Sequence, residues 1–280
     1  MGASGPDRSP LVIAASINGE RTKAENPHVP RSHDEIVETA LDCYAAGAGV
    51  LHAHNASVRL TGPEAADDYL AAWRRVRAAK PDAVWYPTLT LAGGDELEHV
   101  WRIDDAIGLD FACVDPGAVG VAHLDEQGLP SDGFYYQTAF EAIRTVIGQH
   151  RAGRLPAGSV VNFYFGGDHG PFGERSLSFG LPPTRTALDA YLEMLGDAGL
   201  PWTVSCWGGD ILATELPALA IARGGHVQVG LESHFDPRRK PTNQEQIREV
   251  ARLAAEAGRP LADCRTTLAA WRAPKAAALA

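Results

Sequence analysis

The sequence is poor in the features that characterise several common classes of protein. It contains four cysteines among 280 residues, and none of them forms a C-x-x-C pair. Separated cysteines supply neither the disulfide framework of a small secreted domain nor the ligand spacing of a structural zinc site. Two of them, Cys113 and Cys206, stand in apolar runs. We therefore expect reduced, mostly buried thiols in a cytoplasmic protein.

Positive charge and long apolar runs are also scarce. The 25 Lys and Arg residues are outnumbered by 35 Asp and Glu, so the net charge is −10 at pH 7. This balance disfavours nucleic acid and anionic membrane surfaces as partners. No apolar run reaches the roughly 20 residues of a membrane span. Residues 1–10 lack the apolar stretch of a signal peptide, and we expect this segment and residues 271–280 to be flexible tails.

What the sequence does contain is a regular alternation of short apolar runs with amphipathic stretches, which is typical of βα units. Ser32 with Glu35 forms a capping-box pattern before the first helix, which is expected to end at Gly47. Strands are expected at residues 11–17, 49–55, 83–88, 111–115, 134–141, 159–165, 202–207 and 226–233. Further helices are expected at residues 67–79, 95–107, 186–195, 217–222 and 243–257. Around the fifth strand, residues 138–147 could equally form one helix.

Eight strands separated by helices, with no linker between them, predict an α/β fold of the (β/α)₈ TIM-barrel class. We expect residues 1–280 to form a single domain of this kind. A doubly wound open sheet is the alternative. It has little support, because no Gly-x-Gly-x-x-Gly follows the first strand.

A His-x-His motif, His52-Ala53-His54, stands at the end of the second expected strand. Alternate residues of a strand point to the same face, so both imidazoles can reach one ion. The other reading is two histidines that only make local hydrogen bonds. Two histidines and one carboxylate with an open coordination position are typical of catalytic zinc.

The carboxylate that could complete such a site is Glu232, near the end of the eighth expected strand. In a closed barrel the first strand lies between the eighth and the second. Glu232 can therefore reach an ion held by His52 and His54. Other polar residues at the same ends of the strands are candidates for substrate binding or acid–base chemistry: Asn18, Arg21 or Glu20, Thr88, Asp115, Glu141, Gln228 and Ser233. Of these, Glu141 is the candidate acid–base group, since a dry barrel mouth can raise the pKa of a carboxylate.

The pattern resembles the β-keto acid cleavage enzyme family over nearly the whole chain, about residues 11–268. The resemblance depends on short motifs rather than on the His-x-His alone. These are Ile17-Asn18-Gly19 with Thr22, the Asn26-Pro27 to Pro30 loop, Ala46-Gly47-Ala48 before the histidines, Gly224 to Glu232 (GGHVQVGLE), Thr242-Asn243, and Gly258 to Ala262 (GRPLA).

The resemblance implies a zinc-dependent (β/α)₈ barrel with one zinc per chain, usually assembled as a tetramer. It implies a reaction between a β-keto acid and acetyl-CoA that yields acetoacetate and a new acyl-CoA. The family's metal ligands correspond to His52, His54 and Glu232. Its keto-acid-binding serine or threonine corresponds to Thr88, and the glutamate ending its fifth strand corresponds to Glu141.

The sequence departs from the family pattern at several positions, two of which lie close to Glu232. The aspartate that follows the metal-binding glutamate, proposed to act as or with the general base, is Ser233 here, and the arginine four residues before that glutamate is Gln228. An amide cannot make the bidentate contact of arginine with a carboxylate. These departures leave open a metal-binding family member that has lost the reaction. A separate alternative is a zinc hydrolase, in which the metal activates water.

Overall fold

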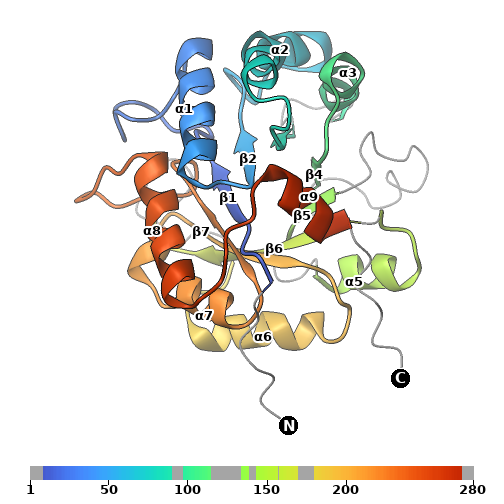
Figure 1. The fold of residues 1–280 in the computed structure, drawn as a ribbon, viewed down its shortest axis with the longest axis vertical. Coiled ribbons are helices and arrows are strands. Elements are labelled where there is room, and N and C mark those ends of the chain that lie inside the picture. The colour runs from blue at the N-terminus through green and yellow to red at the C-terminus, as the bar shows by residue number, and fades with distance from the viewer. Residues whose placement is uncertain are drawn as a thin grey trace.

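The computed structural model describes residues 9–89, 97–114, 134–138, 143–156, 158–169 and 180–272. Its eight strands are all parallel and lie in the order β3-β2-β1-β8-β7-β6-β5-β4. β3 and β4, at the two ends of this order, contact each other. This is the strand order of a (β/α)₈ barrel, with β3 and β4 not hydrogen-bonded within the described part of the chain. Figure 1 shows the helices arranged around the strands.

The elements follow one another as expected from the sequence. The strands are β1 (Ile13–Ser16), β2 (Val50–Ala53), β3 (Trp85–Pro87), β4 (Ala112–Val114), β5 (Phe134–Thr138), β6 (Val160–Gly166), β7 (Trp202–Trp207) and β8 (His226–Val229). The helices are α1 (His33–Ala46), α2 (Gly62–Ala79), α3 (Glu98–Ile107), α5 (Ile143–Arg151), α6 (Arg185–Leu195), α7 (Leu216–Ala222), α8 (Asn243–Glu256) and α9 (Cys264–Arg272), with a short 3₁₀ helix η2 (Ile211–Ala213) after β7.

Several local predictions are confirmed by the backbone geometry. Ser32 caps α1 in a reciprocal capping box with Glu35, and Gly47 closes the helix in the left-handed conformation. The ambiguous fifth segment is a strand over 134–138, and a helix follows only from residue 143. The four cysteines are free and buried, as expected.

Two expected boundaries are wrong, and one helix was not expected. α2 begins at Gly62 rather than at residue 67, because Thr61 takes the N-cap position and a proline follows in the first turn. β8 ends at Val229, whereas the apolar run suggested a strand to Ser233. Gly230 breaks it with a φ of 132°, and a side chain there would collide with the backbone of Ser16. α5 was expected only as an alternative to the fifth strand, and α9 was not expected at all. α9 includes residues 271 and 272 of the expected C-terminal tail, because the Trp271 side chain is buried.

The core is divided between the outside and the inside of the barrel. Outward residues of the strands pack against the helices, as where Trp85 of β3 stacks on Trp73 of α2 at 3.9 Å between ring centroids. Inward residues such as Val12, Val50 and Val160 belong to a second cluster with Trp271 of α9. α9 therefore covers the end of the barrel at which the strands begin.

Toward the ends of the strands the barrel interior becomes polar. Ser16 of β1, Asn162 of β6, Thr203 of β7 and Gln228 of β8 are all at most 2% exposed. Asn162 links the others, because it donates to Gln228 Oε1 at 3.0 Å and accepts from Thr203 Oγ1 at 2.7 Å, while Gln228 donates to Ser16 Oγ at 2.6 Å. We call these four residues the interior network. Among the described residues no helix has the length and apolarity of a membrane span.

Candidate metal centre

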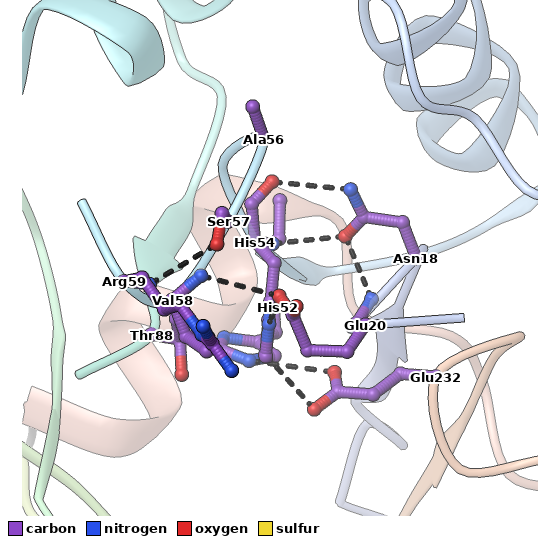
Figure 2. A network of polar contacts seen from close by, with 12 residues as sticks. Asn18, Glu20, His52, His54, Ala56, Ser57, Val58, Arg59, Thr88 and Glu232 are labelled. Atoms are coloured by element: carbon purple, nitrogen blue, oxygen red, sulfur yellow. Dashed lines mark hydrogen bonds and ion pairs between the residues drawn. The ribbon is translucent and has the colours of Figure 1, made fainter. Parts of the chain in front are cut away.

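His52, His54 and Glu232 converge at one point, although 178 residues separate the last two in the chain. Each offers one ligand atom, and these atoms all lie within 4.8 Å of one another. His54 Nε2 is 3.1 Å from Glu232 Oε1, and His52 Nε2 is 3.4 Å from Glu232 Oε2. All three side chains are buried, so the group is shielded from solvent. Figure 2 shows both imidazoles pointing toward the carboxylate.

The other ring nitrogen of each histidine faces a hydrogen-bond acceptor. His52 Nδ1 donates to the carbonyl oxygen of Tyr86 on β3 at 3.2 Å, and its ring stacks on the Tyr86 ring at 4.6 Å between centroids. His54 Nδ1 lies 3.4 Å from the carboxylate of Glu20 (Figure 2). Such outer partners fix the tautomer and turn Nε2 toward a metal.

Glu232 lies beyond the end of β8, and hydrogen bonds to its backbone fix its position. Its amide donates to Ser16 O at 3.2 Å, and its carbonyl oxygen accepts from Arg21 Nε at 3.1 Å. Asn243 at the start of α8 accepts from the amide of Leu231 at 3.0 Å. Gly19 lies against the Glu232 side chain, and any Cβ at position 19 would overlap it. The turn after β8 therefore has a defined position without ladder hydrogen bonds.

The electrostatics of the three residues are those of strongly coupled groups. Burial alone would lower the pKa of His54, but Glu232 and Glu20 together raise it to about 9. Burial would raise the pKa of Glu232, and the two histidines instead hold it far below its usual range. One carboxylate oxygen, Glu232 Oε2, is buried without a hydrogen bond to any described residue. Two imidazoles and a carboxylate with an unsatisfied oxygen fit a divalent cation, and zinc in particular.

A family model described as beta-keto acid cleavage enzyme matches residues 10–154 and 135–270, which together span most of the chain. The chain belongs to this family. The recognition of the family from short motifs in the sequence is thereby confirmed.

Characterised relatives match over most of their length. The 3-keto-5-aminohexanoate cleavage enzyme of Acetoanaerobium sticklandii is 27% identical over 272 residues, which cover 90% of this chain and 94% of the relative. The 3-oxoadipate:acetyl-CoA acetyltransferase of Cupriavidus necator is 23% identical over 273 residues, with 90% and 91% covered. The apo structure of ObcA superposes with a TM-score of 0.63 at 14% identity, covering 88% of this chain and 65% of ObcA. That likeness concerns the fold.

Among the residues predicted to bind substrate, Asn18 and Arg21 lie against the metal ligands. The Asn18 side chain accepts from the amide of His54 at 2.8 Å and donates to the His54 carbonyl at 3.1 Å (Figure 2). It thereby ties the end of β1 to the end of β2. Arg21 is 3% exposed and bonds the backbone of Glu232, as described above. Asn18 and Arg21 therefore hold His54 and Glu232 in place through hydrogen bonds to their backbones.

Thr88 follows β3 and is half-buried. Its amide donates to the Tyr69 hydroxyl at 3.1 Å and its carbonyl oxygen accepts from His99 Nε2 at 2.7 Å. In the view of Figure 2 it lies across the histidines from Glu232. The backbone contacts fix the residue, and its hydroxyl stays a predicted contact for the keto acid.

The two positions that depart from the family pattern have different surroundings. Ser233 directly follows Glu232 in the turn and is 4% exposed, with its carbonyl oxygen bonded to the amide of Gly208 at 2.9 Å. Gln228 lies on β8 with both ends of its amide bonded within the interior network. Their catalytic and substrate-binding roles remain predictions. Asp115 and Glu141 lie outside the described residues.

Two residues of the site were missed or underrated from the sequence. Glu20 was only an alternative to Arg21 at the end of the first strand, yet its carboxylate is the one that faces His54. Asn243 was assigned only to the start of a helix, but its side chain bonds both Leu231 N and Ile17 O. The Thr242-Asn243 pair was the available signal, because an amide just inside a helix cap next to the eighth strand can reach that strand's end.

Proposed function

We propose that this chain is a zinc-dependent β-keto acid cleavage enzyme that transfers an acyl group between a β-keto acid and acetyl-CoA. In the keto acid, the bond breaks between the keto carbon and the CH₂ group that carries the carboxylate. The CH₂-carboxylate fragment bonds to the acetyl group to give acetoacetate, and the CoA sulfur takes the remaining acyl group. No oxidant or water is consumed. The proposal is supported by the family membership and by the two relatives named above. Both relatives are named for keto acids, and one of them also for acetyl-CoA.

The observation that carries the proposal is the convergence of His52, His54 and Glu232 within 4.8 Å. These residues would hold the ion, and zinc when bound supplies a Lewis acid that stabilises negative charge on a carbonyl oxygen. Glu20 and the Tyr86 carbonyl keep the two Nε2 atoms directed at the centre, and Asn18 fixes His54 through its backbone. Burial excludes water that would compete for the acyl group.

The remaining roles are assigned from the sequence. Thr88 would hydrogen-bond the keto acid, Glu141 would exchange the proton, and Ser233 would lie beside the reacting carbon in place of the family's aspartate. Asp115, which follows β4 in the sequence, and Gln228, which lies on β8, would contact the substrate. We also propose the tetramer that the family resemblance implies, which a mass measurement in solution checks directly.

The test is turnover of the purified protein with acetyl-CoA and a panel of β-keto acids that differ in the side chain beyond the keto group. Formation of acetoacetate and of the matching acyl-CoA is followed by mass spectrometry. We expect at least one keto acid to react, and the activity to disappear after chelation and to return with zinc. Magnesium, which prefers oxygen ligands, serves as the control ion.

A zinc-loaded protein that releases free acetate from acetyl-CoA, without forming acetoacetate, would instead support the hydrolase. Full zinc occupancy without turnover of any keto acid would support a family member that has lost the reaction. In that case the double variant Ser233→Asp with Gln228→Arg would be the next protein to assay.

A further inference from the structure

The hydroxyl of Tyr69, on α2, lies between the ends of β2 and β3 and hydrogen-bonds to both of them. It donates to the carbonyl oxygen of Ala53 at 3.1 Å, and it accepts from the amide of Thr88 at 3.1 Å. Ala53 stands between the two histidines of the candidate metal centre, and Thr88 is the residue predicted to bind the keto acid. One hydroxyl therefore connects the backbone of the metal ligands to the backbone of the predicted substrate contact.

This hydroxyl takes the place of a hydrogen bond of the parallel sheet. Two residues before Ala53, the amide of Leu51 donates to the carbonyl oxygen of Val84 on the β3 side. The same pattern, continued along a parallel ladder, would have the amide of Thr88 donate directly to the carbonyl oxygen of Ala53. Both groups bond to Tyr69 instead. Because a hydroxyl is inserted between them, the ends of β2 and β3 are held further apart than a direct bond would allow.

Packing fixes the Tyr69 side chain in this place. It is 2% exposed, and its ring lies 5.8 Å from the Trp85 ring and stacks on the His99 ring at 5.9 Å between centroids. His99 in turn donates through Nε2 to the carbonyl oxygen of Thr88 at 2.7 Å, so two stacked side chains bind the backbone of Thr88. Burial raises the pKa of the Tyr69 phenol far above its usual range, and the hydroxyl therefore keeps the proton that it donates.

We propose that Tyr69 is a positioning residue, whose inserted hydroxyl sets the separation between the His52-Ala53-His54 ligands and Thr88. The inference rests on the proposed function for what occupies the gap, which is a keto acid that meets the metal and Thr88 at the same time. A substrate with two such contacts binds well only when their spacing matches its own. Tyr69 acts through the backbone of both strands, since its hydroxyl bonds to backbone groups.

The test is Tyr69→Phe, which keeps the ring in the core and removes only the hydroxyl. Tyr44→Phe is the matched control, because the Tyr44 hydroxyl of α1 also donates to a strand-side carbonyl, that of Val84 at 2.7 Å, just before β3 begins. Competition with a chelator measures zinc affinity, and the visible absorption of the cobalt-substituted protein reports the ligand geometry. We expect Tyr69→Phe to lower zinc affinity about three- to tenfold and to alter the cobalt spectrum. Tyr44→Phe should change the affinity less than about twofold and leave the spectrum unaltered.

The substrate side is measured by titrating the cobalt-substituted proteins with acetoacetate and following the same absorption. We expect Tyr69→Phe to bind acetoacetate about three- to tenfold more weakly than wild type, and Tyr44→Phe to bind it as wild type does. Urea unfolding of the metal-free proteins compares the stability that each hydroxyl contributes. It separates a general loss of stability, which both variants would show, from a change confined to the centre.

The proposal is overturned if the two variants have the same zinc affinity and the same cobalt spectrum, or if acetoacetate binds equally tightly to both. A wild-type cobalt spectrum that does not respond to acetoacetate contradicts the proposed function instead, and the metal titration then decides by itself whether Tyr69 positions the ligands. A wild type that binds neither zinc nor cobalt contradicts both.

Discussion

Two buried polar clusters lie at the same end of the barrel, and they differ in how well their atoms are satisfied. The candidate metal centre is made of three ionisable side chains, and Glu232 Oε2 has no hydrogen bond within the described chain. The interior network is made of neutral amides and hydroxyls, bonded to one another at 2.6–3.0 Å. Ser16 pairs with His52 in the strand register, so the two clusters are neighbours.

The difference separates a binding site from a structural element. A neutral network whose members bond one another stabilises one arrangement of the strands and needs nothing further. A buried carboxylate between two imidazoles has a high desolvation cost, and a bound cation would offset it. We therefore expect substitutions in the first cluster to lower the affinity for zinc and substitutions in the interior network to lower the stability of the fold.

The largest expected effect is loss of metal from the charged cluster. Replacing Glu232 by Gln keeps the volume but removes the charge that two histidines face. We expect zinc affinity to fall more than about 100-fold, which exceeds the usual effect of an outer-sphere change. Elemental analysis and competition with a chromophoric chelator measure the loss, and His52→Ala should reproduce it.

Glu249→Gln is the control for this loss, because it makes the same exchange on the exposed face of α8, where Glu249 pairs with Arg252. It should retain full zinc content. Equal zinc content in Glu232→Gln and in wild type would show that the ion lies elsewhere, and the two clusters would then no longer differ in function.

The next effect concerns the outer partner of His54. Glu20→Gln leaves an acceptor near Nδ1 but removes the carboxylate that lies 3.4 Å away and helps raise the pKa of His54. We expect zinc affinity to fall about tenfold. A chelator competition at fixed pH measures it, with Glu249→Gln again as the reference. An unchanged affinity would assign Glu20 to some other task, such as holding the amide of Val58.

Much of the charged cluster was predictable from the sequence, because it depends on strand periodicity and strand order. Alternation places His52 and His54 on one face, and barrel closure brings the eighth strand to the first. The position of Glu232 could not be foreseen in detail. Val-Gly-Leu-Glu reads as a continuing strand, whereas close approach of Gly230 to Ser16 turns the chain there.

The neutral cluster was not predictable, and the reason is physical. Asn162 lies inside β6 and Gln228 near the end of β8, and from the sequence either polar side chain could meet substrate. Their partners come from strands 41 to 212 residues away, and a sequence does not show which buried amides will meet. α9 was missed for a similar reason. Its Trp271 is buried against residues of distant strands at the start of the barrel, and a contact of that kind leaves no periodic pattern in the sequence.

The third effect is on stability and not on metal content. Gln228→Ala leaves Ser16 Oγ and Asn162 Nδ2 without the bonds they share with Gln228, and an unsatisfied buried group costs about 1–3 kcal/mol. We expect a loss of that size in urea unfolding, with zinc content unchanged. Gln244→Ala, which loses only a surface bond to Asp42, should cost less than about 0.5 kcal/mol. Loss of zinc from Gln228→Ala would join the two clusters into one functional unit.

The smallest expected effect on stability comes from an exposed group of charges around Glu35. It shows how much weaker such interactions are when solvent screens them. Lys23 and the amides of Arg31 and Ser32 lower the pKa of Glu35 from 4.5 to about 2. Because the folded pKa lies below the unfolded one, Glu35 stabilises the protein above about pH 4.5, and this contribution is lost as the pH falls toward 2. Glu35→Gln retains a capping side chain, and solvent screens the charge, so we expect it to cost less than about 1 kcal/mol at pH 7. Urea unfolding at pH 7 and pH 3.5 should show the difference from wild type shrinking at the lower pH. A difference that persists at pH 3.5 would mean that hydrogen-bond geometry, and not charge, holds this cap.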